Sequence, residues 1–97
     1  MSKTVITDKI IRRENREADG AKYCYTLLMS KSNKVASYMI PLYSVEIEMI
    51  DKDGKRTNAS ARDLFADVGK ALSFFKKLYE SLATPLNLPY ILEDEMQ

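Results

Sequence analysis

The sequence predicts an α+β domain in which an antiparallel three- to four-stranded β-meander packs against one long C-terminal helix, with a short terminal helix after it. The strands are expected over residues about 4–59, where β-branched and aromatic residues alternate with polar ones. The long helix is expected over about 61–82, where apolar residues recur at helical spacing and Pro85 then stops the pattern. Strands followed by helices along one chain are typical of this class.

Length and composition describe an ordinary globular chain. Its 97 residues have room for one domain, and 45% of them are hydrophobic and 30% charged. No apolar stretch is long enough to cross a bilayer, and Lys3, Asp8 and Lys9 interrupt the region where a secretory signal would need an apolar run. The single cysteine, Cys24, agrees with a reducing compartment. A cytoplasmic protein without membrane contact is therefore expected.

The first two strands flank a polar connection. Residues 4–13 are rich in β-branched types, and the polar run 14–20 after them ends in the turn-forming pair Asp19–Gly20. Residues 21–30 alternate, and this alternation places one apolar set on a common face: Tyr23, Tyr25, Leu27 and Met29. A hairpin-like pair of strands is expected.

The middle of the chain predicts a further strand and a return. Residues 32–34 are expected to form a short turn, and residues 35–51 a long extended stretch that Pro41 interrupts, leaving the register around this proline open. Beyond the proline, one face is expected to carry Tyr43, Val45, Ile47 and Met49. A type I′ turn at Asp53–Gly54 would lead into a short strand at about 55–59.

The helical segment carries the strongest periodic signal. Ser60 and Asp63 match a capping box, which predicts that the helix begins directly after Ser60. Gly69 falls inside this helix, where close packing would explain a residue of low helix propensity. Its apolar stripe is expected to comprise Leu64, Val68, Leu72, Phe75, Leu78 and Leu82. Pro89 opens the expected helical tail at about 86–95, which is acidic.

The residue inventory excludes the commonest site chemistries. The chain has no histidine, one cysteine and three isolated glycines, so it lacks the parts of a zinc cluster, a Ser-His pair or a phosphate-binding loop. Asp51 and Asp53 fit a hairpin turn better than a calcium loop. Glu46 and Glu48 could form an acid–base pair, although a solvated outer face explains them better. No enzyme activity, cofactor or bound metal is expected.

Charge is unevenly distributed along the chain. Residues 1–77 hold all 15 basic residues against 10 acidic ones, whereas residues 78–97 hold four acidic residues and no basic one. Nucleic-acid binding is the alternative function, because basic side chains on the first strand could neutralise phosphates. Its candidate contacts are Lys9, Arg12, Arg13 and Arg16. The acidic residues among them and a net charge of +1 weigh against nucleic acid as the partner.

The leading hypothesis is a small non-enzymatic binding or regulatory accessory domain that acts through protein–protein contacts. Its partner is expected to be another protein or a second copy in a homodimer, because one helix can cover only one face of the sheet and tyrosine is enriched at interfaces. The candidate interface residues are Tyr23, Tyr25, Tyr38 and Tyr43.

Three strand segments and the C-terminal region carry a family resemblance. The strand segments are 25–31, 35–38 and 45–48, and the later ones are 82–86 and 92–94. On these, the chain resembles a small family of uncharacterised proteins from Firmicutes, chiefly clostridia, described as a domain of unknown function. Residues 39–44 depart from the short link of that family. The resemblance implies a bacterial cytosolic origin and no activity or site residue.

Overall fold

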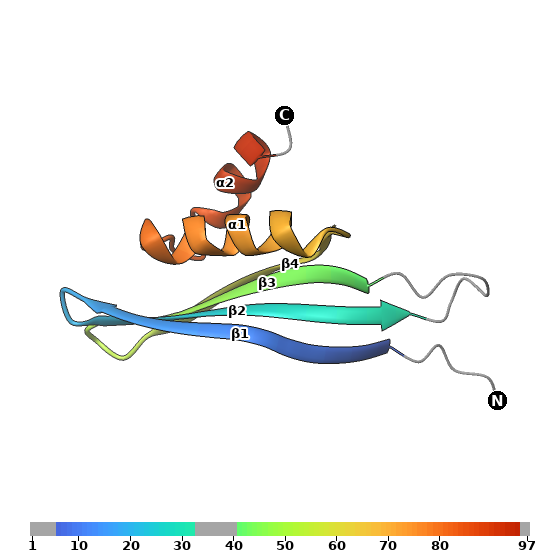
Figure 1. Ribbon diagram of the computed structural model, residues 1–97. Helices are drawn as coiled ribbons and strands as arrows, with labels where there is room; N and C mark the ends of the chain where they lie inside the picture. The colour runs from blue at the N-terminus through green and yellow to red at the C-terminus, as the bar shows by residue number, and fades with distance from the viewer. Residues whose placement is uncertain (1–5, 33–40, 96–97) are drawn as a thin grey trace.

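The computed structural model describes residues 6–32 and 41–95, which form four strands and two helices. The strands are β1 (Ile6–Ala18), β2 (Ala21–Ser32), β3 (Pro41–Ile50) and β4 (Arg56–Phe65), and the helices are α1 (Val68–Glu80) and α2 (Leu88–Glu95). Each strand pairs antiparallel with the next, in the order β1-β2-β3-β4. Both helices lie on one side of this sheet (Figure 1). The predicted α+β meander is confirmed.

The first hairpin is longer than the sequence predicts. The polar run 14–18 continues β1 instead of forming a connection, and Ala18 pairs directly with Ala21. Asp19 and Gly20 between them both have positive φ, at 52° and 81°, which is the geometry of a type I′ turn. Pairing with the well-formed β2 therefore holds polar residues in a strand that their own preferences would not predict.

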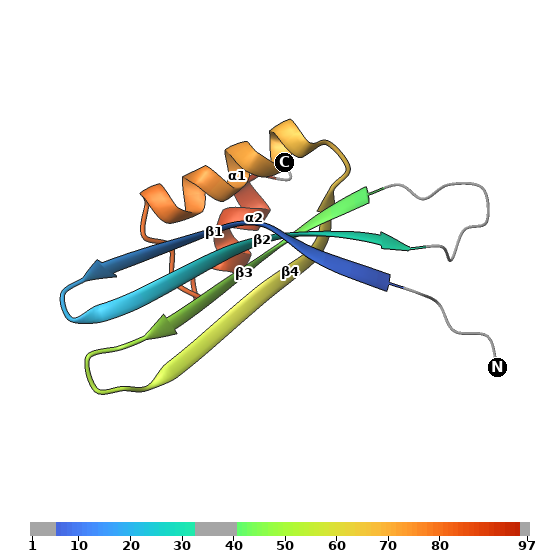
Figure 2. The same ribbon diagram turned by 60° about the horizontal axis from the view of Figure 1, so that its bottom comes forward.

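The alternation in β2 and β3 is confirmed, and it places the core. Tyr25, Leu27, Val45 and Ile47 are each at most 1% exposed and lie against the helices. From α1, the buried side chains are Ala71, Phe74, Phe75, Leu78 and Tyr79. Both edges of the sheet, β1 and β4, are visible beside this core in Figure 2. One apolar layer between the sheet and α1 thus holds the fold together.

The turn between β3 and β4 differs from the prediction. Only Gly54 has positive φ there, at 84°, so a type I′ turn at Asp53–Gly54 is wrong. The Gly54 amide donates to the Asp51 carbonyl at 2.9 Å, and Asp51 Oδ1 accepts from the amides of Asp53 and Lys55. The carboxylate of Asp51 therefore supports the loop, as the hairpin interpretation of these aspartates predicts.

The long helix begins seven residues later than predicted, at Val68 instead of 61, and ends at Glu80 instead of 82. Residues 56–65 form β4, in which Ala59 and Ala61 pair with Ile47 and Val45. The inner-face residues of β4 are alanines, so the strand shows no clear alternation of large apolar and polar side chains. Ser60 lies within this strand and does not cap a helix, so the prediction from the capping box is wrong. The strand expected at 55–59 accordingly extends to 65.

The observed N-cap of α1 is Asp67. Its Oδ1 accepts from the amides of Gly69 at 2.7 Å and Lys70 at 3.3 Å. Gly69 thus lies in the first helical turn, and a Cβ there would stand 3.1 Å from the capping oxygen. Val68, predicted for the buried stripe, is the first residue of α1 and is 45% exposed there.

The C-terminal end of α1 closes with a left-handed residue. Leu82 has a φ of 53°, and the Ala83 amide donates to the Leu78 carbonyl at 3.0 Å. This is the Schellman arrangement, with leucine where glycine is usual. The turn leads to α2, which begins at Leu88 within the predicted tail and is joined to α1 by the pair Lys77–Glu95 at 2.8 Å.

Some predictions lie outside the described residues. These are the candidate interface residue Tyr38, most of the turn expected at 32–34 and the extended segment expected at 35–40. Within the described part of the chain, no helix is long and apolar enough to span a membrane.

Candidate functional site

The face of the sheet opposite the helices is lined by polar side chains. Two rows of paired residues cross all four strands on this open face. One row is Arg13, Thr26, Glu46 and Ser60, and the next is Asn15, Cys24, Glu48 and Asn58. Strand alternation places these residues here because the intervening ones fill the core.

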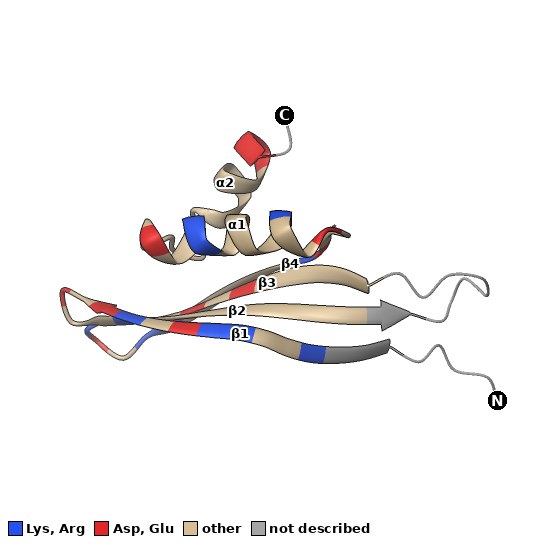
Figure 3. Cartoon of the chain, viewed as in Figure 1, with Lys and Arg blue, Asp and Glu red and all other residues tan. Residues whose placement is uncertain are grey.

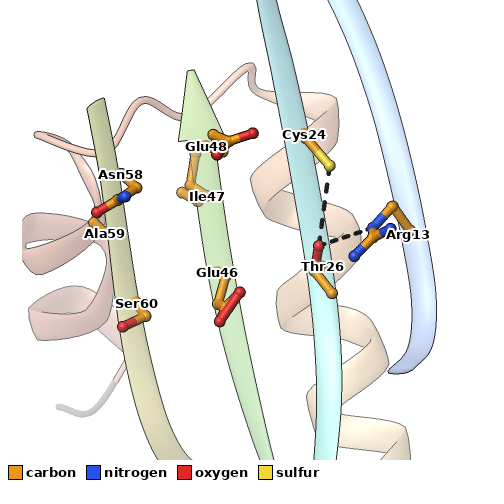
Figure 4. A pocket seen from close by; sticks show the side chains of 9 residues that line it. All are labelled: Arg13, Cys24, Thr26, Glu46, Ile47, Glu48, Asn58, Ala59 and Ser60. Atoms are coloured by element: carbon orange, nitrogen blue, oxygen red, sulfur yellow. Dashed lines mark hydrogen bonds between the residues drawn. The ribbon is translucent and has the colours of Figure 1, made fainter. Parts of the chain in front are cut away.

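The centre of the open face is hollowed. A cavity of about 430 Å³ is lined by Arg13, Cys24, Thr26, Glu46, Ile47, Glu48, Asn58, Ala59 and Ser60 (Figure 4). Arg13 Nε donates to Thr26 Oγ1 at 3.3 Å, and Cys24 Sγ lies 4.0 Å from the same oxygen. Glu46 and Glu48 are exposed on β3, as their alternation predicts. The hollow combines a cation, two carboxylates and neutral hydrogen-bonding groups.

A second polar cluster lies on the helix side of β1. Glu14 accepts from Arg12 at 2.9 Å and from Arg16 at 3.0 Å. The guanidinium carbons of Arg16 and Arg12 lie 4.7 and 5.7 Å from the centre of the Tyr79 ring. The hydrogen bonds from Arg16 and Arg12 lower the pKa of the Glu14 carboxyl from its ordinary value of 4.5. This cluster joins the polar edge strand to α1.

The four basic residues predicted as nucleic-acid contacts do not form one patch. Arg12 and Arg16 lie on the helix side, where Glu14 and Tyr79 engage them, and Lys9 pairs with Met29 on the same side. Arg13 lies on the open face, beside Thr26. Along β1, acidic segments lie among the basic ones, as the red and blue parts of Figure 3 show. Three of the four therefore lie on the helix side, where Glu14 binds two of them, and Arg13 is separated from them by the sheet.

The predicted interface tyrosines also divide. Tyr25 is fully buried, and its hydroxyl donates to the Ala83 carbonyl at 2.8 Å, while Tyr43 is only 8% exposed. Tyr23 is partly exposed and stacks on Tyr25, with ring centres 6.3 Å apart. Tyr25 and Tyr43 therefore serve the core and have almost no surface to offer a partner.

Two features are not predicted by the sequence pattern. Ile10 and Ile11 are 50% and 38% exposed, at a β-bulge between Ile10 and Arg12. The bulge separates two regular parts of β1. It can be recognised only from the pairing of β1 with β2. Tyr79 is buried on α1, and nothing in the local sequence predicts that its ring meets two arginines of β1.

The described residues hold no group of three or more side chains suited to bind a metal ion. They do hold two polar rows across the open face and two strand edges.

Comparison with known proteins gives one assignment. The model of DUF6514, a family of unknown function, matches residues 1–97. The chain belongs to this family. No curated protein and no solved structure matches it. The family resemblance in the strand segments is thus confirmed at the level of a family of unknown function, and the membership brings no activity with it.

Proposed function

We propose that this DUF6514 protein is a small non-enzymatic binding or accessory domain that acts through protein–protein contacts on the uncovered side of its sheet. The observation that carries the proposal is the one-sided packing: α1 and α2 lie on the same side (Figures 1 and 2). The opposite face offers Arg13, Glu46 and Glu48 around one hollow. The family resemblance also supports a bacterial, clostridial and cytosolic setting for this function.

The chemistry of the hollow suits a partner surface of mixed charge. The two exposed carboxylates on β3 favour basic side chains on the partner. Arg13, which donates to Thr26 on the neighbouring strand, favours a carboxylate on the partner. Nucleic acid is a weaker alternative, because carboxylates share the open face with its arginine and the remaining basic residues of β1 lie elsewhere.

The test compares two charge-reversed variants with the wild type as bait in extracts of the source cell. Glu46→Lys/Glu48→Lys changes the open face, and Lys70→Glu/Lys76→Glu changes exposed residues of α1 as a matched control. We expect a protein that the wild type and the control retain and the open-face variant loses, followed by titration of that purified protein. Equal retention by all three baits would overturn the open face as the binding surface.

A further inference from the structure

We infer that the exposed edge of β1 pairs antiparallel with β1 of a second copy of this chain, centred on Asn15, and forms a continuous eight-stranded sheet. The inference goes beyond the proposed function, because it uses an edge of the sheet and not its open face. Three features of β1 support it: the length of its regular segment, the direction of its main-chain groups and the order of its charges.

The regular segment of β1 has clear limits. The bulge between Ile10 and Arg12 interrupts the ladder at one end, and the turn at Asp19–Gly20 ends it at the other. Residues 12–18 between these points pair one-to-one with β2. The middle residue of that segment is Asn15. A two-fold axis at Asn15 therefore lets the regular segments of two copies overlap completely.

The main-chain groups of this segment alternate in direction. Ala18 and Ala21 flank a two-residue turn, a position at which the facing residues exchange both main-chain hydrogen bonds. Even-numbered residues from 12 to 18 then direct these groups to β2, and Arg13, Asn15 and Glu17 direct theirs away from the sheet. The Asn15 carbonyl accepts from Arg16 Nη1 of its own chain at 2.9 Å, a side-chain bond that a second strand would replace. The outer edge is thus a row of main-chain donors and acceptors that another strand can pair with.

The charges around Asn15 are self-complementary. Antiparallel pairing about this residue places Arg13 opposite Glu17 of the second copy on the open face. On the helix side it places Glu14 opposite Arg16 of the second copy. Each of these pairs occurs twice because of the two-fold symmetry. Asn15 faces Asn15 of the second copy. Opposite charges directly across an antiparallel ladder stabilise the pairing.

Neighbouring registers lack this complementarity. A two-fold axis at Glu14 would face Glu14 with itself and Arg12 with Arg16. An axis at Arg16 would place that arginine opposite Arg16 of the second copy. An axis at Arg13 would likewise pair two arginines, and the ladder would then include the bulge. Like charges that face each other directly are destabilising. The register centred on Asn15 is therefore favoured over its neighbours.

The other edge of the sheet is not suited to the same pairing. The charged residues of β4 are Arg56, Arg62 and Asp63. An antiparallel pair centred on Ala59 would place Arg56 opposite Arg62 of the second copy, and the positive φ of Asp63, 56°, breaks the strand near its end. Self-pairing at β1 thus leaves β4 as a protected edge of a larger sheet.

The pairing is tested first by complementary charge reversal, with sedimentation or light scattering over a concentration series. A seven-residue ladder predicts a weak dimer for the wild type. Arg13→Glu and Glu17→Arg each turn two attractive pairs into repulsive ones, so each variant alone should dimerise roughly 10- to 100-fold more weakly. An equimolar mixture of the two should regain the dimer, because each mutated residue then faces its opposite charge.

The controls separate pairing from folding. Arg56→Glu makes the same substitution on the other edge and should leave the dimer unchanged. Far-ultraviolet circular dichroism and thermal midpoints should show that each variant is folded. A wild type that stays monomeric at high concentration overturns the inference, and so does a mixture that stays monomeric like its components.

A disulfide test fixes the register. Facing residues of a hydrogen-bonded pair have Cα atoms about 5.5 Å apart, within reach of a disulfide. Asn15→Cys should therefore cross-link two copies under mild oxidation. Cys24, which pairs with Asn15 across β1 and β2, is replaced by serine to prevent an intrachain bond. Glu17→Cys in the same background is the matched control, because its two copies would stand about 13 Å apart along the strands.

Cross-linking at position 15 and none at position 17 is the expected outcome, and the reverse pattern would overturn the register. The two proposals fail separately. A monomer whose partner is lost from the Glu46→Lys/Glu48→Lys bait would leave the proposed function standing without the dimer. A dimer with no partner lost from that bait would leave β1 pairing standing and remove the open face.

Discussion

The two faces of the sheet are made from the same strands, yet one is buried under the helices and the other is exposed. On the helix side, Tyr25 and Ile47 have no exposed surface and belong to the same buried cluster as Phe75 of α1. On the open side, Glu46 and Glu48 occupy alternate positions of the same β3 strand and face solvent. Free energy of folding therefore comes mainly from the helix side, and the open side keeps its charged groups in solvent.

The largest expected change in the free energy of unfolding comes from a substitution on the helix side. Phe75 is fully buried, and its ring meets that of Tyr79 edge-on with centres 5.5 Å apart. Phe75→Ala should lower the free energy of unfolding by about 3–5 kcal/mol, because it removes buried surface and leaves a cavity. Urea denaturation measures this change. Lys76→Ala, at the exposed neighbour, should change it little, and an equal loss in both variants would contradict the asymmetry.

A smaller effect concerns the hydrogen bond between the core and the end of α1. Tyr25→Phe keeps the ring and removes the hydroxyl that donates to the Ala83 carbonyl. We expect a loss of about 1–3 kcal/mol in the free energy of unfolding, because a buried acceptor is left without its partner. Tyr90, which is 72% exposed, supplies the control substitution Tyr90→Phe, for which no comparable loss is expected.

The same tyrosine predicts a pH dependence. Burial, and next the neighbouring Tyr23, raise the pKa of Tyr25 from 10.0 to about 12. In the unfolded chain the phenol loses its proton near pH 10, whereas the folded chain retains it. The free energy of unfolding should therefore fall between pH 10 and 12, by at most about 1.4 kcal/mol per pH unit. Denaturation at several pH values should show the advantage of the wild type over Tyr25→Phe shrinking in this window. A constant difference would argue against the shift.

The start of α1 offers a test of about 1 kcal/mol. Asp67→Ala removes the carboxylate that caps the Gly69 and Lys70 amides, and a loss of roughly 0.5–2 kcal/mol is expected. Ser60→Ala removes the hydroxyl of the false capping box, which lies exposed on β4, and should be nearly neutral. Thermal denaturation of the pair distinguishes the two helix starts, and a larger effect at Ser60 would favour the earlier one.

The smallest expected effect is on the open face itself. Glu48→Gln removes the charge of an exposed side chain on β3, so the free energy of unfolding should change by less than about 0.5 kcal/mol. The same denaturation experiments detect this. A loss above 1 kcal/mol would mean that the carboxylate stabilises the fold, and the division between the faces would need revision.

The sequence is sufficient to predict the elements whose side chains alternate strongly. The apolar positions of β2 and β3 follow a period of two, and their faces are as predicted. Prediction fails where distant partners decide the structure. Glu14 and Arg16 form a strand only because β2 lies beside them, and Ala59 and Ala61 are strand residues because Ile47 and Val45 pair with them.

The candidate site could be predicted in part. Alternation alone places Glu46 and Glu48 on the outer face of β3. It cannot tell that Arg13, from another strand, shares their hollow, because that depends on the register across three strands and the bulge before Arg12. Likewise, Tyr25 is a reasonable interface residue by type, and only the position of Ala83 shows that its hydroxyl is used internally.

The bond between Tyr25 and Ala83 spans 58 residues of chain, and this has a consequence for synthesis on the ribosome. The strands emerge first, with Tyr25, Leu27, Val45 and Ile47 uncovered, and α1 and Ala83 follow later in translation. During that interval the nascent sheet exposes its apolar face to solvent or to chaperones. Prompt emergence of α1 and Ala83 from the ribosome therefore matters more for this chain than it would for a chain whose helices precede its strands.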